Sequence, residues 1–387
     1  MAEKAQARSA IRVWLIASIR FSLVLVFLVT FLIPHSVFAE NTLEHEMFNT
    51  ISEYGFSPPS QVFCAEQNGV LLASFQDALP AIPASVAKLY VTDWALSMYS
   101  PEYRFTTKVY YSKGVLSIMG GSDPELSEAD LKVIFSRLTK TEKSSLTTIV
   151  FDRNVIVNWQ TSPTLIGTTI ATNAKAYFKR TIKVRYRPLV VPLSKVRLTL
   201  SSSPLLTLLK EMNNYSNNVI ADTLFAKLGG KEALHKYLLT TYGSMGNDAS
   251  FDTGSGTHDT TTSCRLTLSV LKHIEKKLVA LGKTLPDVLV VPTIDSGTVH
   301  NRFLGIGPSL VVKTGYVFHA QTAAGVMNTT NGSLYFAIFT SNIVNPYIPG
   351  GRQLVDELTA DIAKTVTLIP YKYSVNQRSS QSQRTIR

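Results

Sequence analysis

The sequence lacks the residue patterns that mark metal, nucleotide and most cofactor sites. Its 387 residues include only two cysteines, Cys64 and Cys264, which lie too far apart in the chain for a Cys-x-x-Cys site. The seven histidines form no His-x-x-His or His-Glu-x-x-His pattern, and no phosphate loop, dinucleotide fingerprint or nucleophile elbow occurs. We therefore expect no metal and no other cofactor. An oxidising compartment permits a disulfide between the two cysteines, but nothing local demands it.

Long apolar runs are also absent, apart from one near the N-terminus. Residues 1–39 combine basic positions, an apolar run over 21–33 and a small-residue triplet at 37–39, which is the pattern of a cleaved export signal. An uncleaved membrane anchor is the alternative, because the apolar stretch over 13–33 approaches the length that spans a bilayer. In both cases we expect the rest of the chain to be periplasmic or otherwise extracytoplasmic.

Acidic residues are scarcer than basic ones, 27 against 38, so the net charge is +11. Residues 371–387 contain four basic side chains in a Ser/Gln-rich stretch, which predicts a disordered basic tail. A solvated basic surface is the simplest interpretation. Anionic envelope polymers or lipid headgroups are the alternative partners, so peripheral membrane association stays open. Nucleic-acid binding rests on charge alone and conflicts with the export signal, so we expect none.

Turn signals and apolar periodicity divide the chain into elements. Gln67-Asn68-Gly69 predicts a β-hairpin, and the apolar stretch between Pro83 and Pro101 predicts a helix. The later elements are β-prone runs, two helices around an asparagine-rich break, and three strands, over residues 104–195, 202–230 and 309–342. Because strands occur at both ends of the chain, we expect them to share one sheet.

The stretch PASVAKLY places Ser85 three positions before Lys88, at the predicted start of a helix. Free backbone N–H groups and the positive end of the helix dipole can stabilise an oxyanion there. Apolar neighbours would lower the pKa of the Lys88 amine, which then can act as a base toward the Ser85 hydroxyl. A capped helix with a solvated lysine is the alternative, and it fits a second Ser-x-x-Lys at Ser269 and Lys272.

Two further motifs favour catalysis at the first pair. Ser216-Asn217-Asn218 lies in the predicted break between two helices, where a hydroxyl and a carboxamide can face one cleft. Lys313-Thr314-Gly315 ends a predicted strand, where the lysine and threonine can hold a carboxylate and the glycine admits a substrate backbone. A helix cap and a turn are their ordinary alternatives. In this order, however, the three motifs are typical of penicillin-binding proteins and serine β-lactamases.

The motifs and their flanks resemble one family over residues 45–365. The chain is similar to the class C low-molecular-mass penicillin-binding proteins in the stretches PASVAKLYVTDWAL, GGSDPELSEADL, MNNYSNNVIADTLFAKLGG, FDTGSGTHDTTTSC, DSGTVHNRF and VVKTGYVFHAQTAAGVM. These proteins are D-alanyl-D-alanine carboxypeptidases and endopeptidases of bacterial peptidoglycan. The resemblance implies an α+β transpeptidase fold, with helices on both faces of an antiparallel sheet and a reduced β-rich insertion.

Carried over position by position, the resemblance implies a role for each catalytic residue. Ser85 would be the acylated nucleophile and Lys88 its general base. Ser216 would relay a proton to the leaving group, while Asn218 would bind the substrate amide. The backbone N–H of Ser85 would form one half of the oxyanion hole.

The resemblance also assigns the groups that bind the substrate's ends. Lys313 and Thr314 would hold the terminal carboxylate, and Gly315 would let the peptide lie against the strand. Tyr316 would supply the second oxyanion N–H, at a position where the family often has a small hydroxyl residue. Asp123 matches an aspartate that meets the amine of the stem peptide's diamino acid.

The resemblance implies that the transpeptidase domain is interrupted. We expect an export signal over 1–39, the first part of the domain over 40–105, an inserted β-rich domain over 106–195, the second part over 196–370 and the basic tail over 371–387. Only 127 residues separate the first motif from the second. The insertion is therefore expected to be one reduced domain.

We predict an exported serine peptidase that cleaves D-Ala-D-Ala ends of peptidoglycan stem peptides through a Ser85 acyl-enzyme, and that β-lactams inhibit. The sequence leaves open whether the same Ser85 chemistry also cleaves cross-links. A β-lactamase or esterase on the same fold is one alternative, for which Glu125 and Glu128 are nearby carboxylates without an assigned role. A non-catalytic peptidoglycan-binding protein is another, although the intact motifs argue against it.

Overall fold

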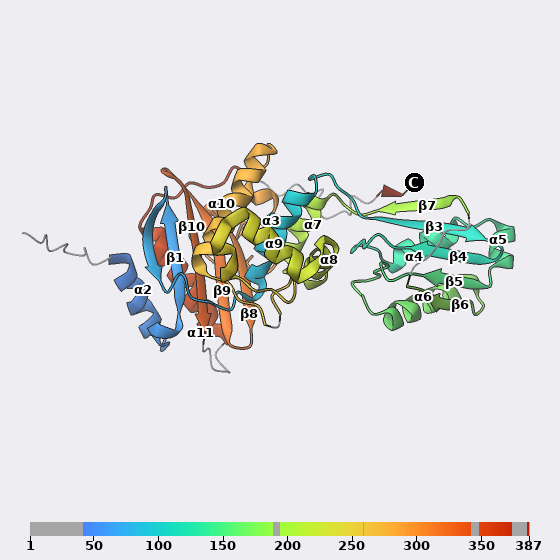
Figure 1. The fold of residues 1–387 in the computed structure, drawn as a ribbon, viewed down its shortest axis with the longest axis horizontal. Coiled ribbons are helices and arrows are strands. Elements are labelled where there is room, and N and C mark those ends of the chain that lie inside the picture. Colours follow the sequence, from blue (N-terminus) through green and yellow to red (C-terminus); the bar gives the residue numbers. More distant parts are fainter. Residues whose placement is uncertain (1–41, 189–193, 258, 342–347, 374–384, 387) are drawn as a thin grey trace, which may run out of the picture.

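The structure is a computed structural model, and it describes residues 42–188, 194–257, 259–341, 348–373 and 385–386. The predicted export signal and most of the predicted basic tail lie outside these residues. Figure 1 shows an elongated molecule with one sheet toward each end and a group of helices between them. Among the described helices, none is both long and apolar enough to span a bilayer.

The first sheet takes strands from both ends of the chain, as expected. Its order is β2-β1-β10-β9-β8, and all neighbouring pairs are antiparallel. The predicted hairpin between β1 and β2 is confirmed: Asn68 and Gly69 have φ values of 53° and 81°, which a two-residue hairpin turn requires. The strands are β1 (Val62–Gln67), β2 (Val70–Phe75), β8 (Leu310–Val317), β9 (Ala320–Thr329) and β10 (Gly332–Ser341).

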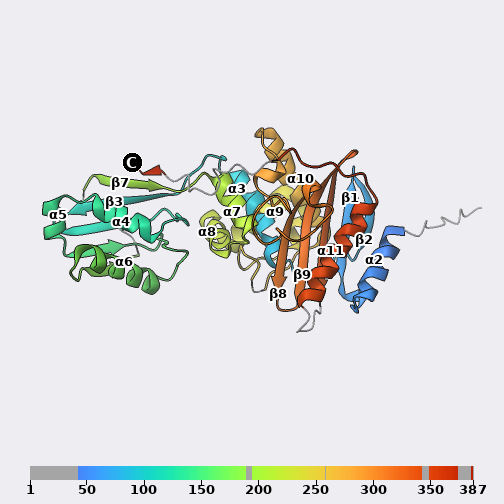
Figure 2. The same cartoon turned by 180° about the vertical axis from the view of Figure 1, so that it is seen from behind.

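Helices cover both faces of this sheet, because successive side chains of each strand point to opposite sides. Phe63 of β1 lies in one core cluster and its neighbour Cys64 in the other. One face packs against α2 (Thr42–Glu53) and α11 (Ile348–Lys364), which Figure 2 shows lying over the strands. The other face packs against α3 (Lys88–Met98), α7 (Leu205–Asn214), α8 (Asn218–Leu228), α9 (Gly230–Tyr242) and α10 (Cys264–Ala280). The predicted α+β fold is confirmed.

The second sheet has the order β11-β7-β3-β4-β5-β6. Strands β3 to β6 come from the predicted insertion over 106–195, whereas β7 begins at Val196 and lies just beyond its predicted end. The domain boundaries themselves stay a prediction. The strands are β3 (Thr106–Ser112), β4 (Val115–Met119), β5 (Thr148–Phe151), β6 (Lys183–Tyr186), β7 (Val196–Ser201) and β11 (Thr385–Ile386).

The β-prone runs of this region predict its strands but not its three helices, α4 (Glu128–Ser136), α5 (Lys140–Ser145) and α6 (Pro163–Phe178). The first two begin with capping boxes, Ser127 with Asp130 and Thr139 with Glu142. Apolar residues of α4 and α6 pack on one face of the sheet and form its core. Short 3-10 turns occur elsewhere, η1 to η5, at Pro58–Ser60, Ala84–Ala87, Gly243–Asp248, Leu285–Asp287 and Gly307–Ser309.

A disulfide joins Cys64 of β1 to Cys264 at the start of α10. The sequence left this pairing open, and the fold decides it because α10 packs across β1. The two cysteines are 200 positions apart in the chain. A cross-link over so long a loop removes many conformations from the unfolded chain.

Reducing this disulfide is expected to lower the free energy of unfolding by about 4 kcal/mol, because the unfolded chain regains the closed loop's entropy. Urea unfolding of the oxidised and reduced proteins measures the difference. The double variant Cys64→Ala/Cys264→Ala is the control, since reductant should not change its transition. Equal urea midpoints for the oxidised and reduced proteins would contradict the expectation.

Candidate active site

Ser85 lies in the short turn η2, directly before α3, with its backbone enclosed by two other segments. The preceding Ala84 has a φ of 46°, a strained value for a residue other than glycine. A Cβ on Gly256 would lie 1.9 Å from the Ala84 oxygen, and a Cβ on Gly315 would lie 2.8 Å from the Ser85 nitrogen. The two glycines therefore allow neighbouring segments to approach the Ser85 backbone closely.

Lys88 is fully buried and points its amine at Ser85. Its Nζ donates to Ser85 Oγ at 2.8 Å, to Asn218 Oδ1 at 2.8 Å and to the Ser255 carbonyl at 3.2 Å. Desolvation by burial lowers the pKa of Lys88 to about 8, although the nearby Asp222 carboxylate opposes the shift. An amine with this pKa is neutral in a useful fraction of molecules close to neutral pH, and the neutral form can accept a proton from the Ser85 hydroxyl.

The second serine and the second lysine also meet. Ser216 lies between α7 and α8 with a φ of 53°, and Lys313 Nζ donates to its Oγ at 3.1 Å. Burial and the nearby Lys88 amine lower the pKa of Lys313 well below its ordinary value. The Asn217 side chain caps α8, whereas Asn218 reaches Lys88. The middle residue of the motif is therefore structural, and the outer two face the cleft.

The remaining predicted binding residues follow Lys313 on β8, which is the edge strand of its sheet. Thr314 is largely buried, while Tyr316 is 46% exposed. Gly315 faces the nucleophile turn, where Thr322 Oγ1 donates to the Pro83 carbonyl at 2.8 Å and holds the turn against the sheet. An edge strand presents backbone N–H and C=O groups to which an extended peptide can pair.

Two residues that the motif analysis left without a role complete the site. Asp222 Oδ1 accepts from the Ser255 N–H at 2.8 Å, and its Oδ2 accepts from the Ser255 hydroxyl at 3.1 Å. Asp222 thereby fixes the carbonyl that binds Lys88, and its charge acts on the Lys88 pKa. The spacing in the sequence could have indicated Asp222, because it follows Asn218 by four positions on α8 and both therefore lie on one helix face.

Asp123 lies in the region of the second sheet, between β4 and α4. It is 1% exposed, and its carboxylate accepts the Glu125 N–H at 3.0 Å. The neighbouring Ser122 lines a pocket of about 550 Å³ together with Val219 and other residues of α8. Because Val219 follows Asn218, the pocket begins beside the site. The contact of Asp123 with a diamino acid stays a prediction.

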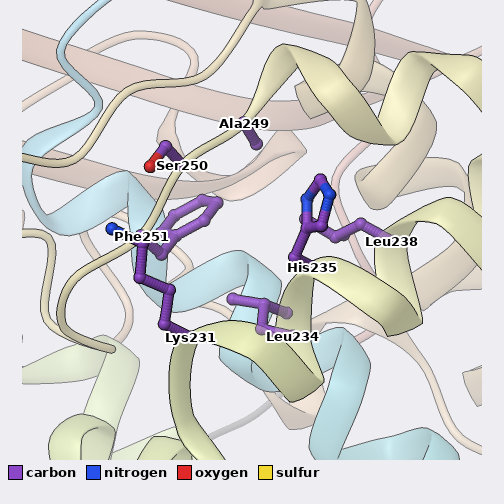
Figure 3. Close-up of a pocket in the computed structure, with 7 residues that line it drawn as sticks. All are labelled: Lys231, Leu234, His235, Leu238, Ala249, Ser250 and Phe251. Atoms are coloured by element: carbon purple, nitrogen blue, oxygen red, sulfur yellow. The ribbon is translucent and has the colours of Figure 1, made fainter.

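A second, smaller cavity lies on α9 and has a volume of about 50 Å³. Figure 3 shows the Phe251 ring and the His235 imidazole on opposite sides of it, with Leu234 and Leu238 from the same helix. Its lining is mostly apolar, it contains none of the predicted site residues, and it is too small for a peptide. The 550 Å³ pocket is the one that adjoins the catalytic contacts.

Comparison with known families identifies the arrangement. A model of the D-Ala-D-Ala carboxypeptidase 3 (S13) family matches residues 61–164 and 152–362. The chain belongs to this family. The family is one of D-Ala-D-Ala peptidases, so the predicted resemblance to the low-molecular-mass penicillin-binding proteins is confirmed. The predicted serine-type D-Ala-D-Ala carboxypeptidase/endopeptidase is confirmed with it.

Solved structures agree with the S13 assignment. The penicillin G-acylated Bd3459 predatory endopeptidase from Bdellovibrio bacteriovorus, in complex with immunity protein Bd3460, is 26% identical with a TM-score of 0.66; the match covers 81% of this chain and 94% of that chain. Penicillin-binding protein 4 (dacB) from Haemophilus influenzae is 15% identical with a TM-score of 0.68, over 82% and 98% of the two chains, and shows similarity of fold alone. No curated protein matches the sequence.

Residues 290–298 form a segment that hydrogen-bonds both to strand β8 and to the loop that carries Ser216. At its start, the carbonyl of residue 290 accepts the Val312 N–H at 2.9 Å. Near its end, Thr298 donates its N–H to the Asn214 carbonyl at 3.0 Å. The segment therefore fixes the distance between the two motifs that meet at the second serine.

Replacing Gly297 in this segment by alanine is expected to slow acylation by penicillin roughly tenfold to a hundredfold. Its φ is +119°, and a Cβ there would lie 2.3 Å from the Asn214 carbonyl, so the loop carrying Ser216 must move. The rate of labelling by a fluorescent penicillin measures the effect. Gly305→Ala is the matched control, because Gly305 has a φ of +90° but no atom within 4 Å of its Cβ. Equal slowing in both variants would count against a positioning role.

Proposed function

We propose that the protein is an exported enzyme that hydrolyses D-Ala-D-Ala ends of peptidoglycan stem peptides through an acyl-enzyme on Ser85. The observation that carries this proposal is the 2.8 Å contact between the Lys88 amine and the Ser85 hydroxyl, in a site that lowers the pKa of that amine to about 8. The export signal that the sequence predicts over residues 1–39 supports action outside the cytoplasmic membrane.

Acylation begins when Ser85 Oγ attacks the carbonyl carbon of the penultimate D-alanine. Neutral Lys88 accepts the hydroxyl proton as the Oγ–C bond forms. The negative charge that develops on the carbonyl oxygen is stabilised by the backbone N–H groups of Ser85 and Tyr316. Collapse of the tetrahedral intermediate breaks the C–N bond and releases D-alanine.

The leaving nitrogen needs a proton at this point, and Ser216 supplies it. Its hydroxyl receives in turn the proton that Lys88 took from Ser85, so Lys88 is neutral again, while the contact with Lys313 Nζ holds Ser216 in place. The carboxamide of Asn218 binds the substrate amide while its Oδ1 also holds Lys88 in place. Water then attacks the acyl carbon, neutral Lys88 accepts a water proton, and Lys88 returns that proton to Ser85 Oγ as the acyl–Oγ bond breaks.

The terminal carboxylate of the substrate is bound by Lys313 and Thr314, beside the glycine that admits the peptide. A carboxylate next to Lys313 raises the pKa that burial had lowered, so the ion pair forms as the substrate enters. Asp123 is proposed to meet the amine of the diamino acid farther along the stem peptide. The exposed Tyr316 ring borders the acceptor side of the cleft.

A fluorescent penicillin tests the proposal. The purified protein is expected to become covalently labelled, and peptide mass analysis is expected to find the adduct on the peptide that contains Ser85. Release of D-alanine from a pentapeptide substrate measures the turnover. A correctly folded protein that takes no label would overturn the proposal. Bd3459, which was solved as a penicillin G acyl-enzyme, supports the expected reaction.

The β-lactamase alternative requires a base that deacylates rapidly. Glu125 Oε2 instead accepts the Ser203 N–H at 2.6 Å, and the Glu128 carboxylate accepts from the amides of Asn158 and Asn173. These contacts hold both carboxylates in the region of the second sheet. We therefore expect slow nitrocefin turnover and a long-lived acyl-enzyme.

Cleavage of cross-links is proposed because Bd3459 is an endopeptidase. Digestion of purified muropeptides, with the products identified by mass spectrometry, measures it.

A further inference from the structure

Positive charge is concentrated in one part of the chain. Residues 106–195 contain 14 lysines and arginines against six acidic residues. The two catalytic parts, 40–105 and 196–370, contain 16 lysines and arginines against 20 acidic residues. The region of the second sheet is therefore strongly basic, whereas the part that contains Ser85 is slightly acidic.

The acidic residues of this region do little to offset the charge at its surface. Asp123, Asp130 and Asp152 are buried. Glu142 forms a 3.1 Å ion pair with an arginine of β7, and Glu128 accepts hydrogen bonds from two asparagine amides. Most of the lysines and arginines, in contrast, are exposed. The surface of the region consequently presents an excess of cations to a partner.

Several of these cations share the sheet face opposite α4 and α6. Val184 of β6 packs against the core that those helices form, so Lys183 and Arg185 on either side of it point to the opposite face. Lys108 of β3 also lies on that face, next to a core valine. Arg187 follows just beyond the end of β6, the last strand of the sheet, and is exposed.

The same face carries hydroxyl groups beside the cations. In the sheet register Lys183 is opposite Thr148, and Lys108 is opposite Thr199. Half-buried apolar residues of β4 and β5 lie between these pairs. Cations with neighbouring hydroxyls fit a hydrated anionic polymer. A lipid surface is less suitable, because peripheral membrane binding also needs large apolar side chains to enter the bilayer.

The basic region leads directly to the catalytic site. The 550 Å³ pocket is lined by Arg153 and Asn154 from this region and by Thr223 and Lys227 from α8. Helix α8 begins at Asn218, which contacts Lys88. A polymer that is bound to the basic region can therefore reach Ser85 through a pocket that is lined by residues of both parts of the molecule.

We infer that the basic face of the second sheet, defined by Lys108, Lys183, Arg185 and Arg187, binds the peptidoglycan polymer while its stem peptides enter the cleft. The inference rests on the proposed function and names the polymer as the working form of the substrate. Stem peptides carry free carboxylates, so the polymer presents many anions to a surface with many cations. A soluble fragment presents few anions, so this face adds little to its binding.

The experiment uses the full-length enzyme and insoluble peptidoglycan sacculi. The variant Lys183→Glu/Arg185→Glu/Arg187→Glu is compared with Lys236→Glu/Lys276→Glu/Arg352→Glu, an equal charge change at exposed basic residues of the catalytic part. Co-sedimentation with sacculi at low and near-physiological salt measures binding. Release of D-alanine from sacculi and from a soluble pentapeptide measures turnover.

The face variant is expected to lose roughly tenfold in binding to sacculi and in turnover of sacculi, and to lose its salt dependence. Its turnover of the pentapeptide and its labelling by penicillin should stay within about twofold of the original protein, as should every property of the control. Unchanged binding of the face variant, or an equal loss in the control, would overturn the inference.

Two further arms separate the other outcomes. Vesicles that contain phosphatidylglycerol are tested in the same sedimentation assay, and stronger binding to them than to sacculi would assign the face to lipid and overturn the inference. Ser85→Ala is tested for binding to sacculi, which should persist without catalysis. Failure of the proposed function appears differently, as a lack of penicillin labelling in the original protein.

Discussion

Replacing Ser85 by alanine is expected to abolish covalent labelling by penicillin and to lower D-alanine release by at least roughly 10⁴-fold. The substitution removes the oxygen that forms the acyl bond, while the rest of the site stays in place. Labelling on a gel and D-alanine release from a pentapeptide measure the two effects. The small change in volume at a partly exposed position should leave the melting temperature nearly unchanged.

The chain contains its own control for this prediction in the second Ser-x-x-Lys. Ser269 donates to the Arg265 carbonyl within α10, and Lys272 forms a 2.5 Å ion pair with Glu66. Ser269→Ala should therefore label and turn over like the original protein. If Ser85→Ala still takes the label, or if Ser269→Ala loses it, the nucleophile is not Ser85.

Replacing Lys88 by methionine is expected to slow acylation roughly 10³- to 10⁴-fold, because a methionine fills a similar volume but cannot accept a proton. The Asn218 and Ser255 oxygens also lose their donor, so the variant is expected to be less stable by about 1–3 kcal/mol. Lys88→Arg keeps a cation that does not deprotonate, and it should be equally slow. Circular dichroism confirms that each variant is folded before its rate is compared.

The pH dependence distinguishes a base from a structural lysine. Only the neutral amine of Lys88 accepts the Ser85 proton, and its pKa is lowered to about 8. The acylation rate should therefore rise about tenfold per pH unit below that pKa and level off above it. Lys88→Met should lose this dependence, and Lys272→Met should retain it. A rate that is independent of pH between 6 and 9 in the original protein would exclude Lys88 as the base.

Local signals in the sequence predicted much of the fold. Asn68-Gly69 predicted a hairpin, and the Asn-rich break predicted two helices where α7 and α8 occur, the second ending at Gly229 with its left-handed φ of 114°. These features depend on backbone preferences of a few neighbouring residues, so a short stretch suffices to identify them. The helices of the second sheet's region show the limit. Their capping boxes were present, but β-prone runs on either side dominated the pattern.

Contacts between distant segments could not be predicted in the same way. The disulfide joins Cys64 to Cys264 because α10 lies across β1, and no pattern around either cysteine specifies that packing. Asp222 acts on Lys88 through Ser255, which comes from a loop between other elements. Such contacts depend on how whole layers pack, and that is decided by the burial of many side chains at once.

By itself, the sequence determined the chemistry of this protein: three motifs in order and their flanks specify the kind of reaction and the residues that we propose for it. The tertiary structure alone decided how the site works. Burial lowers the pKa of Lys88 to about 8, and strands and helices from separate parts of the chain bring its amine to Ser85 and Asn218. A residue's identity is a local property, whereas its desolvation and its partners are properties of the packed molecule.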